Sequence, residues 1–172
     1  MEKKITRLAV FDFDGTLVDT PLPTDKTKAL YKQKTGEAWE HKGWWGRKET
    51  LDQDIFDMPV IESVIADYEK EKAKTNTLVV MITGRIKRLS GKVESILDSK
   101  GLEFDGYYYN MGGSTFDNKI NTMESLLKQY PDIKKIHLFD DRDEHIPLFQ
   151  DWGDNLVSSN QLNDFEITHV KK

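Results

Sequence analysis

Short apolar segments that end in polar turns recur along the chain. Residues 5–11, 77–82 and 135–139 are rich in branched and aromatic side chains, and each is followed by Asp or Gly residues within a few positions. These segments are apolar throughout rather than alternating, which is typical of strands covered on both faces of a parallel sheet. Further, shorter strands are expected at 107–109, 156–157 and 165–170.

Helical spacing separates these strands. Apolar side chains recur every three or four residues in segments 60–73, 86–99 and 119–130, as on the buried face of an amphipathic helix. Pro59 suits the start of the first of these helices, and Gly101 and Pro131 suit the ends of the other two. A shorter helix is expected over 143–151. The alternation predicts an α/β fold, a three-layer open parallel sheet of Rossmann type with right-handed crossovers.

One long segment interrupts this alternation. Residues 18–58 are polar, contain Pro21 and Pro23, carry the sequence GWWGR at 43–47, and include one expected helix at about 25–34. Such a length is unusual for a connection in a compact domain and is typical of lids and binding loops. We interpret 18–58 as a flap or small cap, inserted after the first strand of a single domain that spans residues 1–172.

Composition narrows the classes of protein to consider. The chain has 37% hydrophobic and 32% charged residues and no cysteine, which excludes disulfides, thiolate metal sites and cysteine nucleophiles. No apolar run approaches the length of a membrane span, so we expect a cytoplasmic protein without a membrane partner. The formal net charge of −5 argues against binding along a nucleic-acid duplex. A polyanion would have to be held by a few well-placed Lys and Arg residues.

Reactive polar side chains follow the three strongest strands. They are Asp12, Asp14, Gly15 and Thr16 after the first, Thr83, Gly84 and Arg85 after the second, and Asp140, Asp141, Arg142 and Asp143 after the third. The carboxyl ends of parallel strands meet at one edge of the sheet, where ligands bind in such folds. Four carboxylates so close together need raised pKa values or a metal ion. Oxygen ligands alone favour a hard ion such as Mg²⁺, which serves phosphate chemistry.

Three of these segments resemble the motifs of the haloacid dehalogenase (HAD) superfamily of phosphotransferases. The sequence FDFDGTLVD at 11–19 matches the first motif at every position, VVMITGR at 79–85 is similar to the second, and LFDDRDEH at 138–145 is similar to the acidic fourth. Lys119 is the candidate for the third-motif lysine, with Lys92, Lys100 and Lys128 as alternatives.

The resemblance implies a phosphatase that forms an aspartyl-phosphate. Asp12 would be the nucleophile, and Asp14 would be the general acid and base. Mg²⁺ would be held by Asp12, by the backbone carbonyl of Asp14, and by Asp140 and Asp141. Dehalogenases of the superfamily lack the acid/base residue at position 14, so phosphoryl transfer is expected here.

The resemblance also implies a set of phosphate-binding residues. Thr83 and Lys119 would bind the phosphoryl oxygens, and Gly15 would allow backbone N–H groups to approach them. Thr16 and Gly84 complete this expected set.

The fourth motif resembles that of the phosphatase domain of phage polynucleotide kinase, and together with GWWGR it resembles HAD domains associated with RNA repair. Both imply a nucleotide or nucleic-acid terminal phosphate as substrate, with Arg47 and Arg142 on phosphate and Trp44 and Trp45 stacking on a base. For the tryptophans the alternative is packing within the flap. For the protein, the alternatives are a phosphatase of small metabolites and an inactive module that binds a phosphorylated partner.

Overall fold

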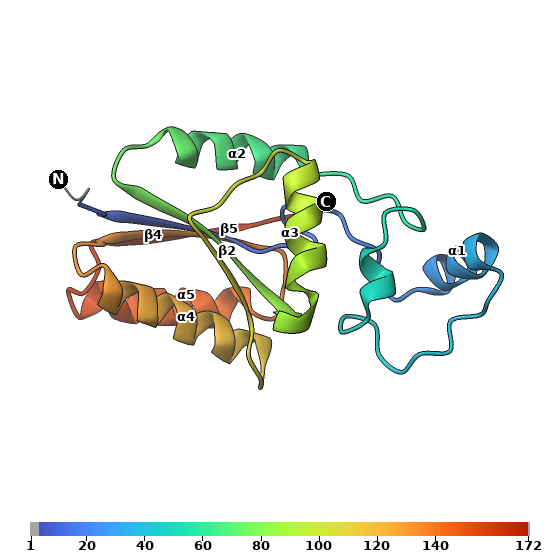
Figure 1. Ribbon diagram of the computed structural model, residues 1–172. Helices are drawn as coiled ribbons and strands as arrows, with labels where there is room; N and C mark the ends of the chain where they lie inside the picture. Colours follow the sequence, from blue (N-terminus) through green and yellow to red (C-terminus); the bar gives the residue numbers. More distant parts are fainter. Residues whose placement is uncertain (1–3, 172) are drawn as a thin grey trace.

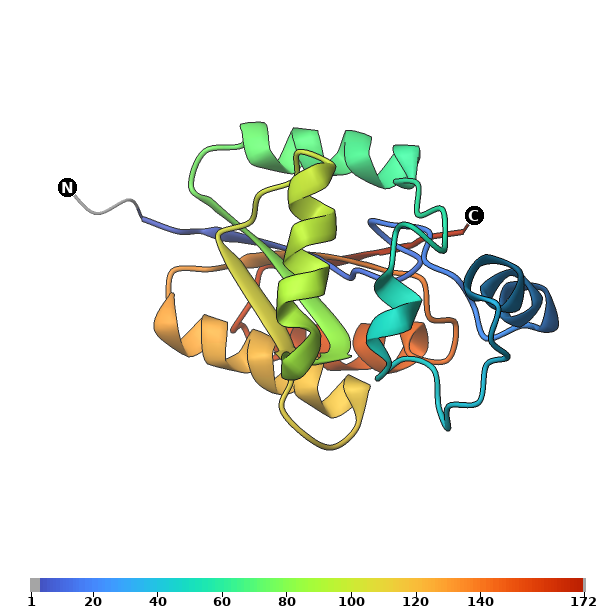
Figure 2. The same cartoon turned by 45° about the vertical axis from the view of Figure 1, so that its right-hand side comes forward.

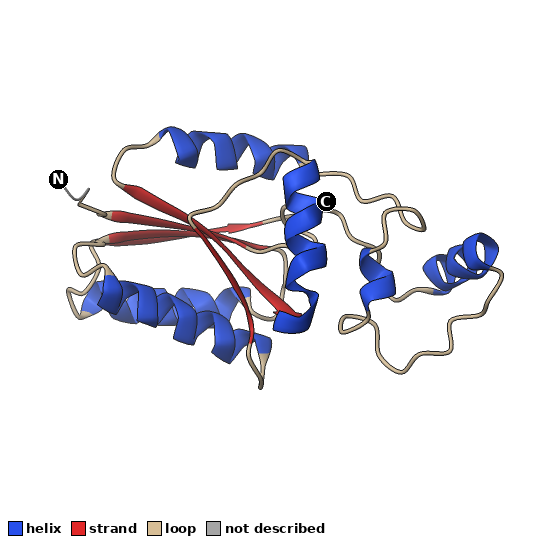
Figure 3. Cartoon of the chain, in the orientation of Figure 1, coloured by secondary structure: helices blue, strands red, loops and turns tan. Residues whose placement is uncertain are grey.

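Five parallel strands form the centre of the fold, in the order β3-β2-β1-β4-β5 (Figures 1 and 3). The computed structural model describes residues 4–171. The strands are β1 (Arg7–Phe11), β2 (Thr77–Ile86), β3 (Gly106–Asn110), β4 (Lys135–Asp140) and β5 (Asp164–His169). The α-helices are α1 (Asp25–Thr35), α2 (Glu62–Ala73), α3 (Ser90–Ser99), α4 (Thr115–Gln129) and α5 (Ile146–Ser158), with short 3-10 helices η1 (Lys48–Leu51) and η2 (Lys87–Leu89). The predicted α/β class is confirmed.

Helices cover both faces of the sheet because successive strand residues point to opposite sides. Ala9 and Phe11 of β1 belong to one apolar cluster with buried residues of α2 and α3. Leu8 and Val10 belong to a second cluster with buried residues of α4 and α5. Figure 1 shows α2 on one side of the sheet and α4 and α5 on the other. The strands are therefore buried on both faces, which explains their continuous apolar sequences.

The chain adds strands first on one side of β1 and then on the other. After β1 it moves outward to β2 and β3, and it then returns through α4 to β4 and β5. In the parallel pairing of β1 with β4, Phe11 lies opposite Phe139, and the Asp12 N–H donates to the Phe139 carbonyl at 3.1 Å. The register thus places Asp12 beside Asp140 at the switch point of the sheet, where α/β folds bind ligands.

One predicted strand is wrong. Leu156 and Val157 lie in α5, which extends from Ile146 to Ser158. Together with Phe149, Trp152 and Gly153 these residues have the spacing of one helix face, and Phe149 is fully buried. The polar pair at 154–155 lies on the exposed side of that helix and does not end it.

The segment 18–58 contains α1 and η1 and projects beyond the carboxyl ends of the strands (Figure 2). Its two ends are joined by backbone pairing: Val18 bridges Val60, and the Asp19 N–H donates to the Pro59 carbonyl at 2.8 Å. We call residues 18–58 the flap segment, a name for its position only. None of the helices within residues 4–171 is both long and apolar enough to cross a membrane.

Candidate active site

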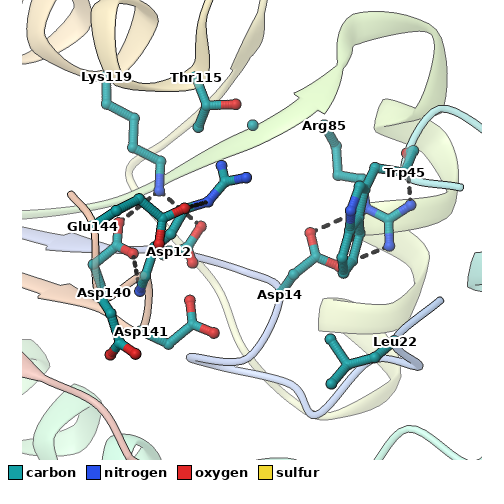
Figure 4. Close-up of a pocket in the computed structure, with 13 residues that line it drawn as sticks. Asp12, Asp14, Leu22, Trp45, Arg85, Thr115, Lys119, Asp140, Asp141 and Glu144 are labelled. Carbon is teal, nitrogen blue, oxygen red and sulfur yellow. Dashed lines mark hydrogen bonds and ion pairs between the residues drawn. The ribbon is translucent and has the colours of Figure 1, made fainter. Parts of the chain in front are cut away.

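An open pocket of about 380 Å³ lies at the carboxyl ends of the strands (Figure 4). Its walls come from the loop after β1, the end of β2, the start of α4, the loop after β4 and the flap segment. The lining residues are Asp12, Asp14, Leu22, Trp45, Gly84, Arg85, Thr115, Lys119, Asp140, Asp141, Arg142, Asp143 and Glu144. The ends of the three strongest strands therefore meet in one pocket, as sequence analysis predicted.

Three carboxylates and one ammonium group lie together in this pocket. Lys119 Nζ donates to Asp12 Oδ1 at 2.9 Å and to Asp140 Oδ2 at 2.7 Å. A carboxylate oxygen of Asp141 lies within 4.8 Å of carboxylate oxygens of Asp12 and Asp140. Lys119 is buried on α4. The helix brings its ammonium group between Asp12 and Asp140, which are 107 and 21 residues away from it in the sequence.

This cluster contains more acidic groups than basic groups. Burial, together with the neighbouring carboxylates of Asp140 and Asp141, raises the pKa of Asp12 well above its usual range, although Lys119 opposes this shift. Burial alone would lower the pKa of Lys119, but the carboxylates of Asp12 and Asp140 raise it. Lys119 is therefore charged at neutral pH, and one ammonium group faces three carboxyl groups.

A divalent cation fits this donor set. The ligand atoms are carboxylate oxygens from Asp12, Asp140 and Asp141, and no His or Cys belongs to this cluster of described residues. Hard cations such as Mg²⁺ prefer oxygen ligands. A cation would also remove the repulsion that raises the pKa of Asp12.

Asp14 lies apart from this cluster and faces Arg85. Arg85 Nη2 donates to Asp14 Oδ1 at 2.7 Å, and Nε donates to Oδ2 at 3.0 Å. Thr20 Oγ1 also donates to Asp14 Oδ1, at 2.7 Å. Figure 4 shows the Asp14–Arg85 pair on one side of the pocket and the cluster around Lys119 on the other. The two carboxylates of the first motif thus occupy different environments within one pocket.

The buried guanidinium of Arg85 also holds the flap segment. Its Nη1 donates to the Trp45 carbonyl and to Thr50 Oγ1, both at 2.7 Å. The indole ring of Trp45 lies over the same guanidinium, 5.1 Å from ring centre to Cζ. One side chain therefore connects the loop after β1, the end of β2 and the flap segment.

Three residues expected to bind phosphate have other partners. Thr16 is buried and its Oγ1 donates to Asp12 Oδ2 at 3.2 Å, so it orients Asp12. Gly15 has φ = 72°, a conformation that favours glycine, and its N–H donates to the Val18 carbonyl. Thr83 Oγ1 accepts from the Arg85 N–H at 3.1 Å, and Thr83 does not line the pocket.

Gly84 does line the pocket, and its lack of a side chain has a clear reason. A Cβ atom there would lie 2.6 Å from Thr115 Oγ1 at the start of α4. Glycine therefore allows α4, and with it Lys119, to approach the end of β2.

The two adjacent tryptophans of the flap segment, Trp44 and Trp45, have different surroundings. Trp44 is buried, its Nε1–H donates to the Pro21 carbonyl at 2.8 Å, and its ring contacts Trp39 and Phe56. It thus belongs to the core of the flap segment and does not line the pocket. Trp45 lines the pocket and is 39% exposed.

The two arginines expected on phosphate are also separated. Arg47 lies outside the pocket lining, and its Nη2 is 3.4 Å from Glu49 Oε1. Arg142 lines the pocket mouth, where its Nε donates to Glu144 Oε1 at 2.9 Å. Its backbone N–H donates to Asp140 Oδ1 at 3.0 Å and orients that carboxylate.

Sequence analysis placed Arg85 at a strand end without giving it a role, and it did not single out Thr20 or Thr115. Arg85 directly follows Thr83 and Gly84, so its position at the strand end was the available signal. Its link to the flap segment requires the fold, because Trp45 and Thr50 are 40 and 35 residues away in the sequence.

A family model described as "HAD domain family 1 in Swiss Army Knife RNA repair proteins" matches residues 20–172. The chain belongs to this HAD family. The matched range includes Thr83, Lys119, Asp140 and Asp141 but begins after Asp12 and Asp14. The family match of this HAD domain therefore does not include the first motif. The assignment of that motif depends on its sequence and on the position of Asp12 and Asp14 in the pocket.

One curated relative of this HAD domain is an uncharacterized protein of Saccharomyces cerevisiae, YMR265C. The two are 26% identical over 177 residues, which cover 90% of this chain and 38% of the yeast protein. The chain thus spans less than half the length of this relative. No solved structure matches the chain.

Proposed function

We propose that this HAD domain is a Mg²⁺-dependent phosphomonoesterase that acts on the terminal phosphate of a nucleotide or nucleic acid. The observation that carries the proposal is the position of Asp12 at the end of β1, hydrogen-bonded to Lys119 and clustered with Asp140 and Asp141. The family, with its description in RNA repair proteins, supports both the chemistry and the class of substrate.

In the first step, an oxygen of the Asp12 carboxylate attacks phosphorus, and the bond from phosphorus to the leaving oxygen breaks. The leaving oxygen takes a proton from Asp14, and the product is an alcohol and an aspartyl-phosphate at Asp12. Lys119 and Thr16 hold the Asp12 carboxylate through one oxygen each. This fixes the rotation of the nucleophile before substrate binds.

In the second step, Asp14 takes a proton from water, whose oxygen attacks phosphorus and releases Asp12 and inorganic phosphate. Arg85 and Thr20 orient the Asp14 carboxylate for this work. Mg²⁺ held by Asp12, Asp140, Asp141 and the Asp14 carbonyl would reduce repulsion between the attacking carboxylate and the phosphate.

Turnover of a generic aryl phosphate with Mg²⁺ tests the chemistry. Asp12→Asn keeps the shape of the side chain and removes its nucleophilic oxygen, so the rate should fall at least about 10³-fold. Asp98→Asn, at an exposed position of α3, changes the net charge equally and should retain the rate. Equal rates for Asp12→Asn and the wild type would contradict the proposal.

Chemical trapping tests the intermediate directly. Borohydride reduces an acyl phosphate to an alcohol, so mass spectrometry of protein quenched during turnover should find the reduced side chain at position 12. A panel of nucleotides, phosphate-ended oligonucleotides and sugar phosphates then tests the substrate class. The highest kcat/KM for a sugar phosphate would favour a metabolite phosphatase instead.

A further inference from the structure

One part of the flap segment of this acidic protein carries an excess of positive charge. Residues 25–48 contain seven Lys and Arg against three Asp and Glu, a net charge of +4, in a chain whose net charge is −5. The rest of the chain is therefore strongly negative. A basic segment in an acidic protein marks a surface for a negatively charged ligand when its charges are unpaired.

The lysines of this segment are exposed and unpaired. Lys26, Lys28, Lys32 and Lys34 lie on α1, and all four are exposed. None of the four has an ion pair with a carboxylate in the part of the chain that the structure describes. Their charges are balanced by mobile counterions, which a polyanion would displace.

The flap segment forms one wall of the pocket. Leu22 precedes α1 and Trp45 follows it, and both line the pocket. Ring contacts hold α1 in this place: Tyr31 of α1 packs on Trp39 with ring centres 5.0 Å apart, and Trp39 packs on Trp44 at 4.7 Å. These contacts join α1 to the core of the flap segment, which lies beyond the carboxyl ends of the strands (Figure 2).

We infer that α1 is the docking surface for the phosphate backbone of a single-stranded nucleic acid whose terminal phosphate lies in the pocket. The inference rests on the proposed function, because it places that terminal phosphate beside Asp12. The exposed ring of Trp45 lines the pocket and offers a platform for a base near the end of the nucleic-acid strand. An acidic protein would match the lysines, but it would leave this ring and the pocket without ligands.

Binding can be measured without turnover. In an Asp12→Asn background, fluorescence anisotropy of a labelled single-stranded oligonucleotide with a terminal phosphate gives the affinity at several salt concentrations. The variant carries Lys26→Gln, Lys28→Gln, Lys32→Gln and Lys34→Gln. Lys28 and Lys32 lie one turn apart on one face of α1. The loss of at least these two phosphate contacts should reduce the slope of log affinity against log salt by about 1.4, which is about 7-fold in affinity between 50 and 200 mM salt.

A matched control separates docking from general electrostatics. Lys70→Gln, Lys72→Gln, Lys92→Gln and Lys128→Gln remove the same charge from exposed positions on α2, α3 and α4. This control should keep the salt slope of the background. The same slope in the α1 variant and the background would overturn the inference, as would an equal loss in the control variant. Circular dichroism should show both variants folded.

Three further comparisons complete the test, and the first distinguishes this inference from the function on which it rests. A strand ending in a hydroxyl should bind less tightly than one ending in a phosphate, and equal affinity would contradict the proposed function of the pocket. Polyglutamate should compete weakly with the strand, whereas binding as tight as the strand's would overturn the inference in favour of an acidic protein partner. RNA and DNA strands, tested side by side, should both depend on α1, because the lysines contact phosphate and not sugar.

Discussion

Arg85 and Asp14 form a two-point ion pair, with Nη2 2.7 Å from Oδ1 and Nε 3.0 Å from Oδ2. Arginine is suited to this position because its planar guanidinium can serve several acceptors at once in a fixed geometry. The remaining nitrogen holds Trp45 and Thr50 of the flap segment. The orientation of Asp14 and the position of the pocket wall therefore depend on the same side chain.

Arg85→Lys should lower kcat for an aryl phosphate by about 10²-fold, because lysine keeps the charge but cannot hold Asp14 and the flap segment together. Steady-state kinetics with saturating Mg²⁺ measures this. Arg88→Lys is the control, since Arg88 is an exposed arginine of η2 with one contact of 3.5 Å to the Gly46 carbonyl. An unchanged kcat in Arg85→Lys would show that this geometry does not limit the reaction.

Replacing Trp44 should affect the stability of the protein, whereas replacing Trp45 should affect substrate binding. Trp44→Ala leaves a cavity in the core of the flap segment and should destabilise the protein by about 3–5 kcal/mol in urea unfolding. If the flap segment unfolds separately from the sheet, the lower free energy of unfolding should appear in the unfolding transition of the flap segment.

Trp45→Ala should leave the free energy of unfolding nearly unchanged and raise KM for an oligonucleotide, because base stacking contributes about 1–3 kcal/mol. KM for an aryl phosphate, which carries no base, should change less. Equal effects of Trp45→Ala on both substrates would argue against a base on this ring.

Mg²⁺ should raise the midpoint of thermal unfolding. The ion would bind the folded cluster of Asp12, Asp140 and Asp141 but not the unfolded chain, and it would add about 2.7 kcal/mol at a concentration 100 times its dissociation constant. Asp140→Asn should abolish most of this shift, and Asp98→Asn should keep it. The same shift in all three proteins would place the ion elsewhere.

Chelation provides the corresponding test of activity. EDTA should remove aryl phosphatase activity, and added Mg²⁺ should restore it. Full activity after chelation would contradict a metal in this site.

Glu71 makes the stability of the fold dependent on pH. Burial alone would raise its pKa, but hydrogen bonds from Arg7, His137 and Lys74 lower it far below the usual value. Below the unfolded value of about 4.3, the unfolded chain binds a proton that the folded protein does not. Glu71 therefore stabilises the folded protein fully above about pH 4.3, and this stabilisation is lost progressively as the pH falls below that value.

Urea unfolding at several pH values measures this effect. Between about pH 5 and pH 3 the wild type should lose stability with a slope that approaches 1.4 kcal/mol per pH unit from this group. Glu71→Gln should be less stable at neutral pH but should lack this part of the slope. Glu69→Gln, at an exposed position on the same helix, should keep it, and identical slopes in all three would refute the assignment.

Much of the fold could be predicted from the sequence because strand burial and helix spacing are local properties. The apolar segments at 5–11, 77–82 and 135–139 became β1, β2 and β4 with small shifts in their ends. The error at Leu156 and Val157 arose because two apolar residues in a row suit a strand as well as a helix.

The candidate site was less predictable, since its geometry depends on contacts between distant residues. Asp12 and Asp140 could be expected at one edge because both follow strands. Sequence alone could not distinguish Trp44 from Trp45, since adjacent residues point in different directions. It also could not reveal that Thr83 and Arg47 are turned to other partners.

The close approach of β2 and α4 at Gly84 provides a test of how the site is assembled. A Cβ atom at position 84 would lie 2.6 Å from Thr115 Oγ1 and 2.7 Å from Thr115 Cγ2. Gly84→Ala should therefore push α4 away from β2 and destabilise the protein by about 1–3 kcal/mol. Because Lys119 lies one turn further along α4, phosphatase activity should fall as well.

Thr115→Ala removes both of the clashing atoms and leaves only its Cβ, at 3.3 Å. The double variant should thus recover most of the stability and activity lost in Gly84→Ala, with a coupling free energy of about 1–2 kcal/mol in a double-mutant cycle. Gly91→Ala is the control, since a Cβ atom there meets nothing within 4 Å and alanine favours a helix. If the two substitutions at 84 and 115 were simply additive, the contact between β2 and α4 would not be what positions Lys119.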